Sequence, residues 1–194
     1  MDSPYPRATF LRSQESQAFE DFWRTLRGDK LVPARADFQP TKARRFLGDI
    51  VLMEAPSEQR PVYRIRVTGQ RFDNLVGVNL TGRNNLDFMP EKYHAGSVAA
   101  GRLVVEMPCG MWQISPAHLV RGYATNLEIT AFPLAADESG QAYILMQVLP
   151  AGGLNSVSLP IDQGLGIDTA VTHQYIDIGA GTPGSETSGP GSAR

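Results

Sequence analysis

Two stretches of this chain are apolar at almost every position, and they constrain its fold more than any other feature. Residues 50–53 read Ile-Val-Leu-Met, and residues 142–149 are apolar at nearly every position apart from Gln147. A strand whose side chains are apolar on both faces is covered on both faces. We therefore expect these two segments, the first and the last strand along the chain, to lie at the centre of one sheet.

Two other segments alternate between apolar and polar residues. Residues 63–67 place tyrosine, isoleucine and valine on one face and two arginines on the other, and residues 123–132 set Asn126 and Glu128 against a more apolar face. This period of two predicts strands with one face in water. Residues 111–114 complete five predicted strands, and the Asp-Glu-Ser-Gly turn at 137–140 predicts a hairpin between the last two.

Helical periodicity marks the start and the middle of the chain. In residues 13–27 four apolar side chains recur at positions i, i+3, i+4 and i+7 and define an amphipathic helix: Phe19, Phe22, Trp23 and Leu26. Gly28 predicts the end of that helix. Residues 37–47 predict a second, shorter helix, residues 69–76 a short helix in the middle, and residues 90–103 a connecting helix. The mixture of elements indicates an α+β fold.

The balance of charge excludes several classes of partner. The chain has 194 residues, and 18 basic against 20 acidic side chains give a formal net charge of -2, so nothing attracts it globally to nucleic acid or to an anionic membrane. No segment approaches the roughly 20 apolar residues of a membrane span, and the N-terminus lacks the apolar core of a signal peptide. We expect a cytoplasmic protein without nucleic-acid or membrane partners.

The residues that carry chemistry form no recognised catalytic pattern. Cys109 is the only cysteine, which excludes an internal disulfide and a multi-cysteine zinc site. His118 and His173 lie in sequence typical of loops, and His94 falls in the predicted connecting helix, where a partly exposed histidine is commoner than a haem ligand. There is no nucleophile elbow, phosphate loop or His-Glu-x-x-His motif. We therefore expect no enzyme, no catalytic residues and no metal site.

Three short strings are similar to one known family. They read Leu-Arg-Gly-Asp-Lys-Leu-Val-Pro-Ala-Arg-Ala-Asp-Phe at 26–38, Tyr-Arg-Ile-Arg-Val-Thr-Gly at 63–69 and Leu-Thr-Gly-Arg at 80–83. With these strings and its order of elements, the chain from about Phe19 to Pro150 resembles the stand-alone bacterial PAS-like proteins. The resemblance implies a PAS fold, which is a five-stranded antiparallel sheet in the order 2-1-5-4-3 with short helices on one face.

The resemblance also implies a sensor or interaction module, and it carries over no catalytic residue. Cys109 lies on a different element from the cysteine of photosensory PAS domains, so flavin photochemistry is not expected. A PAS sheet is concave beneath its short helices, and a pocket for a small molecule is expected there. Its expected lining residues are Met53, Phe72, Val76, Met89, Tyr93, Met111 and Met146. The alternative interpretation is that these side chains only fill the core.

These observations together predict a regulatory protein without an output domain of its own. In the first hypothesis it senses a small molecule, whose identity and any cofactor the sequence leaves open, and signals by contact with another protein. In the alternative hypothesis it is a ligand-free interaction adaptor. The apolar stripe of the N-terminal helix packs on its own sheet or on a second copy, and the expected interface of a homodimer is Phe19, Phe22, Trp23 and Leu26.

The chain divides into four predicted parts. Residues 1–47 form an N-terminal helical cap, residues 48–150 the PAS core, and residues 151–178 a C-terminal extension with one short strand or an arm within 171–178. Residues 179–194 are rich in glycine and lack large apolar side chains. Such a segment does not repay the entropy of ordering, so we expect a disordered tail.

Overall fold

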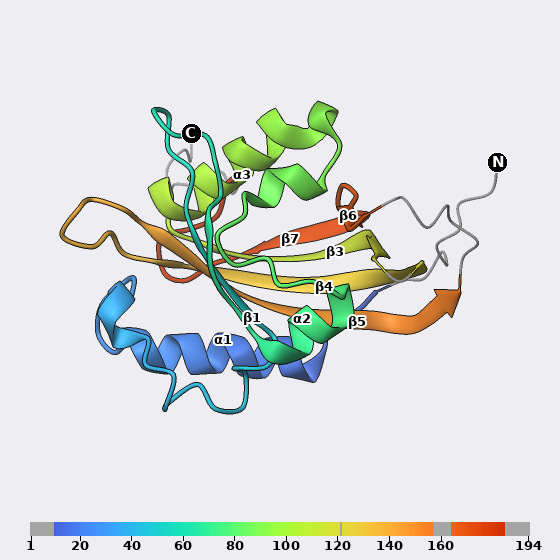
Figure 1. The fold of residues 1–194 in the computed structure, drawn as a ribbon. Helices are drawn as coiled ribbons and strands as arrows, with labels where there is room; N and C mark the ends of the chain where they lie inside the picture. Colours follow the sequence, from blue (N-terminus) through green and yellow to red (C-terminus); the bar gives the residue numbers. More distant parts are fainter. Residues whose placement is uncertain (1–9, 121, 157–163, 185–194) are drawn as a thin grey trace, which may run out of the picture.

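A computed structural model describes residues 10–120, 122–156 and 164–184, and these residues form one antiparallel sheet of seven strands (Figure 1). The strands are β1 (Ile50–Glu54), β2 (Ile65–Thr68), β3 (Gly110–Leu119), β4 (Tyr123–Leu134), β5 (Tyr143–Ser156), β6 (Gly166–Ile167) and β7 (Thr172–Ile176). Their order is β2-β1-β5-β4-β3-β6, and β7 also pairs with β3. The predicted order 2-1-5-4-3 and the α+β PAS fold are confirmed, and β6 and β7 extend the sheet beyond β3.

One helix covers one face of this sheet. Helix α1 (Gln14–Arg27) begins at Ser13, whose hydroxyl accepts a hydrogen bond from the Ser16 N–H at 3.1 Å, and ends at Gly28, whose φ of 54° favours glycine. Figure 1 shows α1 lying across the strands on the side opposite α3. The predicted amphipathic helix is confirmed.

Several shorter helices cover the other face. They are α2 (Gln70–Val76), the 3-10 turns η2 (Asn85–Phe88) and η3 (Glu91–Tyr93), and α3 (His94–Glu106). Phe72 and Val76 of α2 share one buried cluster with Val104 of α3. The sheet is therefore covered on both faces. Within the described residues, none of these helices combines the length and the apolar character that crossing a bilayer requires.

The predicted helix at residues 37–47 is wrong. The structure has one 3-10 turn, η1 (Arg35–Asp37), followed by a series of hydrogen-bonded turns as far as Leu47. Pro40 has no backbone N–H to donate, and the Phe46 N–H bonds to the carbonyl of Ala43, three residues back, at 2.8 Å. The apolar residues of this segment still reach the core beneath α1, because turns as well as helices can bury Phe38 and Phe46.

The prediction that β4 has one face in water is also wrong. Asn126 and Glu128 are only 3% and 5% exposed. Glu128 lies beneath the start of α1, where its Oε1 accepts hydrogen bonds from the Ser13 N–H at 2.9 Å and from the Trp112 indole N–H at 2.7 Å. Glu128 thus belongs to the contact between the sheet and α1, and its two hydrogen bonds offset the cost of its burial.

A bulge changes which residues of β2 point inward. The register between β1 and β2 shifts between Leu52 and Met53, so Val67 pairs with Leu52 whereas Ile65 pairs with Met53. Ile65 is buried as expected, but Val67 is 41% exposed. The alternation of residues 63–67 therefore predicts the strand correctly but not the orientation of its last apolar residue, because an extra residue in one strand breaks the period of two.

Candidate ligand cavity

Alternate residues of the same strands build two separate cores. On one face, Leu127 and Ile129 of β4 and Ile144 of β5 pack toward α3. On the other, Phe132 of β4 and Leu145 of β5 pack beneath α1. Each core is a continuous apolar layer, and the period of two along the strands keeps them apart.

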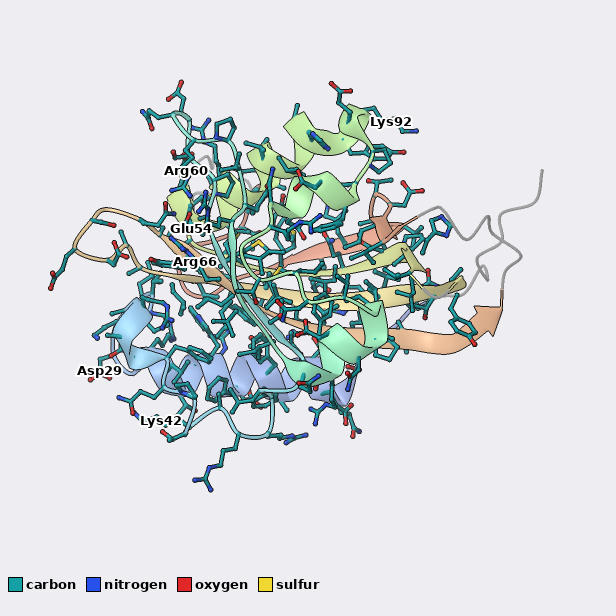
Figure 2. All side chains as sticks on the ribbon, viewed as in Figure 1. Asp29, Lys42, Glu54, Arg60, Arg66 and Lys92 are labelled. Carbon is teal, nitrogen blue, oxygen red and sulfur yellow. The ribbon has the colours of Figure 1, made fainter. Side chains whose placement is uncertain are left out.

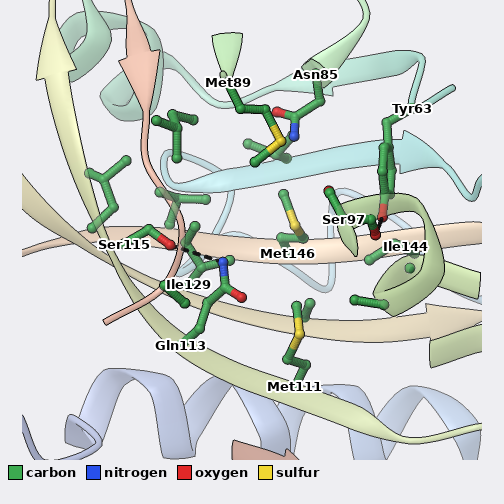
Figure 3. Close-up of a pocket in the computed structure, with 18 of the residues that line it drawn as sticks. Tyr63, Asn85, Met89, Ser97, Met111, Gln113, Ser115, Ile129, Ile144 and Met146 are labelled. Carbon is green, nitrogen blue, oxygen red and sulfur yellow. Dashed lines mark hydrogen bonds between the residues drawn. The ribbon is translucent and has the colours of Figure 1, made fainter. Parts of the chain in front are cut away.

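The face beneath α3 encloses a cavity of about 330 Å³ (Figure 3). Its floor is formed by the central strands and its roof by α3 and the turns that precede it. Ala131 of β4 lies between Met111 of β3 and Met146 of β5 in the strand register, so a small side chain occupies the middle of the floor. In Figure 3 the Met111 and Met146 side chains extend into the space above these strands.

Six of the seven residues expected to line a pocket do line this cavity: Met53, Phe72, Met89, Tyr93, Met111 and Met146. The seventh, Val76, is fully buried in the adjoining core but does not reach the cavity. It lies at the last turn of α2, one turn beyond Phe72. That the six residues bind a ligand stays a prediction.

Tyr63 brings a polar group to the cavity wall. Its hydroxyl donates a hydrogen bond to the Ser97 carbonyl in α3 at 2.5 Å. Burial raises the pKa of the Tyr63 hydroxyl to about 12. The Tyr63 side chain packs so closely on Gly101 that a Cβ atom there would overlap it, so glycine is required for α3 to pack against Tyr63. Tyr63 is thus a neutral, fixed donor that joins sheet and roof.

The lining also contains polar residues that were not among the seven predicted ones. Gln113 of β3 donates from its amide to the Ser115 hydroxyl at 3.0 Å, and both side chains line the floor. The strand predicted at residues 111–114 was too short, and β3 continues to Leu119. Gln113 and Ser115 follow a period of two and lie on one face of β3. The other polar residues of the lining are Asn85, Lys92, Ser97, Asp168, Thr169, His173 and Tyr175.

Exposed lining residues mark the mouth of the cavity. On one side they are Lys92 and Gly96, at the start of the roof, and on the other Thr169 and His173, near the C-terminus. Figure 2 shows Lys92 at the N-terminal end of the helical layer. Among the described residues of the lining, only Lys92 and Asp168 are Lys, Arg, Asp or Glu. The deeper wall is uncharged.

The histidines and the cysteine take positions that differ in part from expectation. His118 and His173 lie on strands β3 and β7 and not in loops, because the C-terminal extension pairs with an elongated β3. The His94 Nε2 lies 3.0 Å from the Met89 carbonyl, and His94 is not part of the lining. Cys109 is buried, and burial raises the pKa of its thiol to about 11, which keeps it protonated.

In the part of the chain that the structure describes, no three His, Cys, Asp or Glu side chains gather in a way that would hold a metal ion. The buried carboxylate of Glu54, at the end of β1, accepts hydrogen bonds from the guanidinium groups of Arg60 and Arg66 (Figure 2). This cluster pairs a buried charge and anchors the end of the strand.

The four residues expected at an interface divide into two pairs. Phe19 and Trp23 are fully buried on the chain's own sheet, where Trp23 stacks on Phe132 at 4.9 Å between ring centroids. They are therefore not part of the surface of this chain. Phe22 and Leu26 are half-buried at the edge of the same core and remain partly accessible.

An antiparallel sheet in this order, with a cavity beneath its helices, is the architecture of a PAS domain. The family model described as PAS domain matches residues 11–148, and the chain belongs to this family. A search of curated proteins finds no significant match.

Two solved structures are similar over part of the chain. A fungal LOV domain photoreceptor has 18% sequence identity and a TM-score of 0.40, covering 53% of this chain and 74% of its own. The Rhodobacter sphaeroides LOV protein has 12% identity and a TM-score of 0.42, covering 73% of this chain and 69% of its own.

Proposed function

We propose that this PAS domain is a sensor whose cavity binds a small, mainly apolar and uncharged molecule. The observation that carries the proposal is the cavity of about 330 Å³ inside an otherwise well-packed domain. Protein interiors rarely hold voids larger than a water molecule. The volume lies instead in the range of small-molecule sites, about 300–1,000 Å³.

The apolar part of the wall supports the same proposal. An apolar ligand would remove that part of the wall from water, which is favourable. Four of the six methionines of the chain line the cavity, and their flexible, polarizable side chains adapt to a flat or irregular molecule: Met53, Met89, Met111 and Met146.

The distribution of charge supports an uncharged ligand body. The deep wall offers neutral groups such as the Tyr63 hydroxyl and the Gln113 amide, whereas Lys92 and Asp168 stand at or near the mouth. An ion moved into the deep part would lose its hydration without gaining a charged partner. The ligand would place apolar atoms inside and any strongly polar group at the mouth.

A pair of matched fluorescent probes tests this function. N-phenylnaphthylamine is uncharged and aromatic, and anilinonaphthalene sulfonate has the same rings with an anionic group. We expect saturable binding of the uncharged probe at one site per chain and clearly weaker binding of the sulfonate. Ala131→Phe would fill the middle of the floor and abolish binding, while Val171→Phe, at an exposed position outside the lining, would not.

Thermal melting of both variants shows whether Ala131→Phe still folds. A folded Ala131→Phe protein that binds the uncharged probe as tightly as the unmodified protein would contradict the proposal. Absence of saturable binding to the unmodified protein would also contradict it, and would favour a ligand-free interaction adaptor.

We propose in addition that the signal leaves this domain by contact with another protein chain, either a second copy or a signalling partner. The half-buried Phe22 and Leu26 of α1 are the accessible part of the expected interface. Sedimentation velocity over a range of concentrations tests the homodimer: Leu26→Ser would weaken self-association. A monomer at every concentration would leave a different protein as the partner and would refute the homodimer.

A further inference from the structure

Part of the cavity wall comes from residues that follow the matched PAS domain. The family match ends at residue 148, yet six residues between 167 and 175 line the cavity. They are Ile167, Asp168, Thr169, Ala170, His173 and Tyr175. We call residues 166–178 the C-terminal arm.

Backbone pairing fixes the arm to the outer edge of the sheet. Residues of β6 pair with Ala117 and His118 of β3, and β7 pairs with the segment from Gly110 to Ile114. Between these two ladders, the Asp168 N–H donates to the Pro116 carbonyl at 2.8 Å and the Val171 N–H donates to the Ile114 carbonyl at 2.9 Å. Residues 168–171, which connect the two strands, are therefore held beside the cavity.

The end of the arm reaches the opposite face of the sheet. Tyr175 packs against the core on the cavity side, whereas Ile176 and Ile178 are buried in the core beneath α1. Two arginines in the last turn of α1 then bond to the arm: the Arg24 guanidinium donates to the Asp177 carbonyl at 3.0 Å, and that of Arg27 donates to the Ile178 carbonyl at 2.8 Å. The arm thus connects the cavity to the helix on the other face.

The arm also forms one side of the mouth. Thr169 and His173 are exposed and line the cavity, and Lys92 and Gly96 are the exposed lining residues of the roof. Any molecule that enters between these two sides passes the side chains of Thr169 and His173. His173 pairs in register with Gln113 of the floor, so polar groups continue from the arm into the cavity.

We propose that the C-terminal arm belongs to the ligand site. It forms one side of the path by which the ligand enters, and its hydrogen bonds to α1 hold that side in place. This inference rests on the proposed function of the cavity. The ligand it implies has an apolar body and a polar group that stays at the mouth, where Lys92 stands on one side and Asp168 and His173 on the other. Residues of the arm would then select the ligand by its polar group.

Two tryptophan variants of the arm test the entry path, with N-phenylnaphthylamine as the probe in stopped-flow fluorescence. Thr169→Trp adds a large side chain at the mouth and is expected to slow both association and dissociation several-fold. Val171→Trp is the matched control, because Val171 is 59% exposed, lies two residues further along the arm and does not line the cavity. Its rates should equal those of the unmodified protein.

A second pair of variants tests the anchor on α1. Arg27→Gln removes the guanidinium that bonds to Ile178 and is expected to speed both amide hydrogen exchange in residues 172–176 and dissociation of the probe, by roughly tenfold for a charge-assisted hydrogen bond. Arg44→Gln, at an exposed position outside the arm, is the control.

The outcomes separate this inference from the function on which it rests. If the unmodified protein binds the probe but Thr169→Trp leaves both rates unchanged, the arm is not part of the entry path and the inference is wrong, while the sensor proposal stands. If the unmodified protein shows no saturable binding, the sensor proposal itself fails. Equal slowing by Thr169→Trp and Val171→Trp would also overturn the inference, because it would show an effect of bulk anywhere on the arm.

Discussion

The two faces of the sheet are made from the same strands but are packed in different ways. Beneath α1, aromatic rings fill the space. The ring centroid of Phe19 lies 5.5 Å from that of Phe46 and 6.1 Å from that of Phe132, and Trp23 stacks on Phe132. Beneath α3, the four methionines surround about 330 Å³ of open space. The first face is filled by the chain's own side chains, and the second contains open space.

Polar groups differ between the faces in the same way. On the α1 face they bond to one another across long distances in sequence, as the Ser16 and Thr130 hydroxyls do at 2.6 Å and the Trp23 indole N–H does to the Pro133 carbonyl at 2.9 Å. On the cavity face, Gln113 bonds to its neighbour Ser115 and Tyr63 bonds to the Ser97 carbonyl, while Asn85 and other polar side chains border the open space. The α1 face is thus closed almost entirely by the chain itself, although the buried Gln147 Oε1 on that face has no hydrogen-bond partner among the described residues, and the cavity face leaves open space.

The largest effect is expected for Trp23→Ala on the α1 face. Trp23 is completely buried and loses both its stacking on Phe132 and its hydrogen bond, so the free energy of unfolding should fall by about 3–5 kcal/mol. Denaturant unfolding monitored by circular dichroism measures this loss. A loss below about 1 kcal/mol would show that the α1 face is not the more tightly packed of the two.

A smaller effect should separate two neighbours on β5. Leu145 points beneath α1 and is fully buried, whereas Met146 is half-buried and lines the cavity. Leu145→Ala should lower the free energy of unfolding by about 2–5 kcal/mol. Met146→Ala should cost less, because much of its surface faces open space, but it should change the affinity for N-phenylnaphthylamine.

The same unfolding and binding experiments on both variants check this pair. Equal losses of stability, or a change in probe affinity for Leu145→Ala but not for Met146→Ala, would contradict the difference between the faces. Leu145 and Met146 are neighbours on the same strand. A difference between the two variants would therefore reflect the packing of each side chain and not the propensity of the strand.

The sequence predicted the centre of the sheet because the signal there is local. Residues 50–53 and 142–149 are apolar on both faces, and that pattern alone requires cover from two sides. The orientation of α1 followed from its apolar stripe. The prediction that one face of β4 lies in water failed because Ser13 and Trp112 cover Glu128 and bond to it. The residue pattern of a strand does not show that a helix from elsewhere in the chain packs on it.

The cavity was predicted in its apolar part and missed at its mouth. Methionine and aromatic residues on the concave face are typical of such a wall, and six of the seven candidates line it. Lys92, Thr169 and His173 carry no comparable signal, because exposed polar residues in short elements have the composition of any surface. The positions of Thr169 and His173 at the mouth depend on β7 pairing with β3, and the short strand predicted within residues 171–178 is confirmed as β7. Of the predicted tail at 179–194, residues 185–194 lie outside the described residues.

The most direct test of the account uses the methionines as reporters. In protein labelled with carbon-13 at the methionine methyl groups, nuclear magnetic resonance follows each methyl during titration with N-phenylnaphthylamine. We predict large shifts for Met53, Met89, Met111 and Met146, which line the cavity, and an unmoved signal for the exposed Met107 at the end of α3. Shifts confined to Met107, or no shift in the four lining methyl groups at saturating probe, would contradict a ligand site inside the domain.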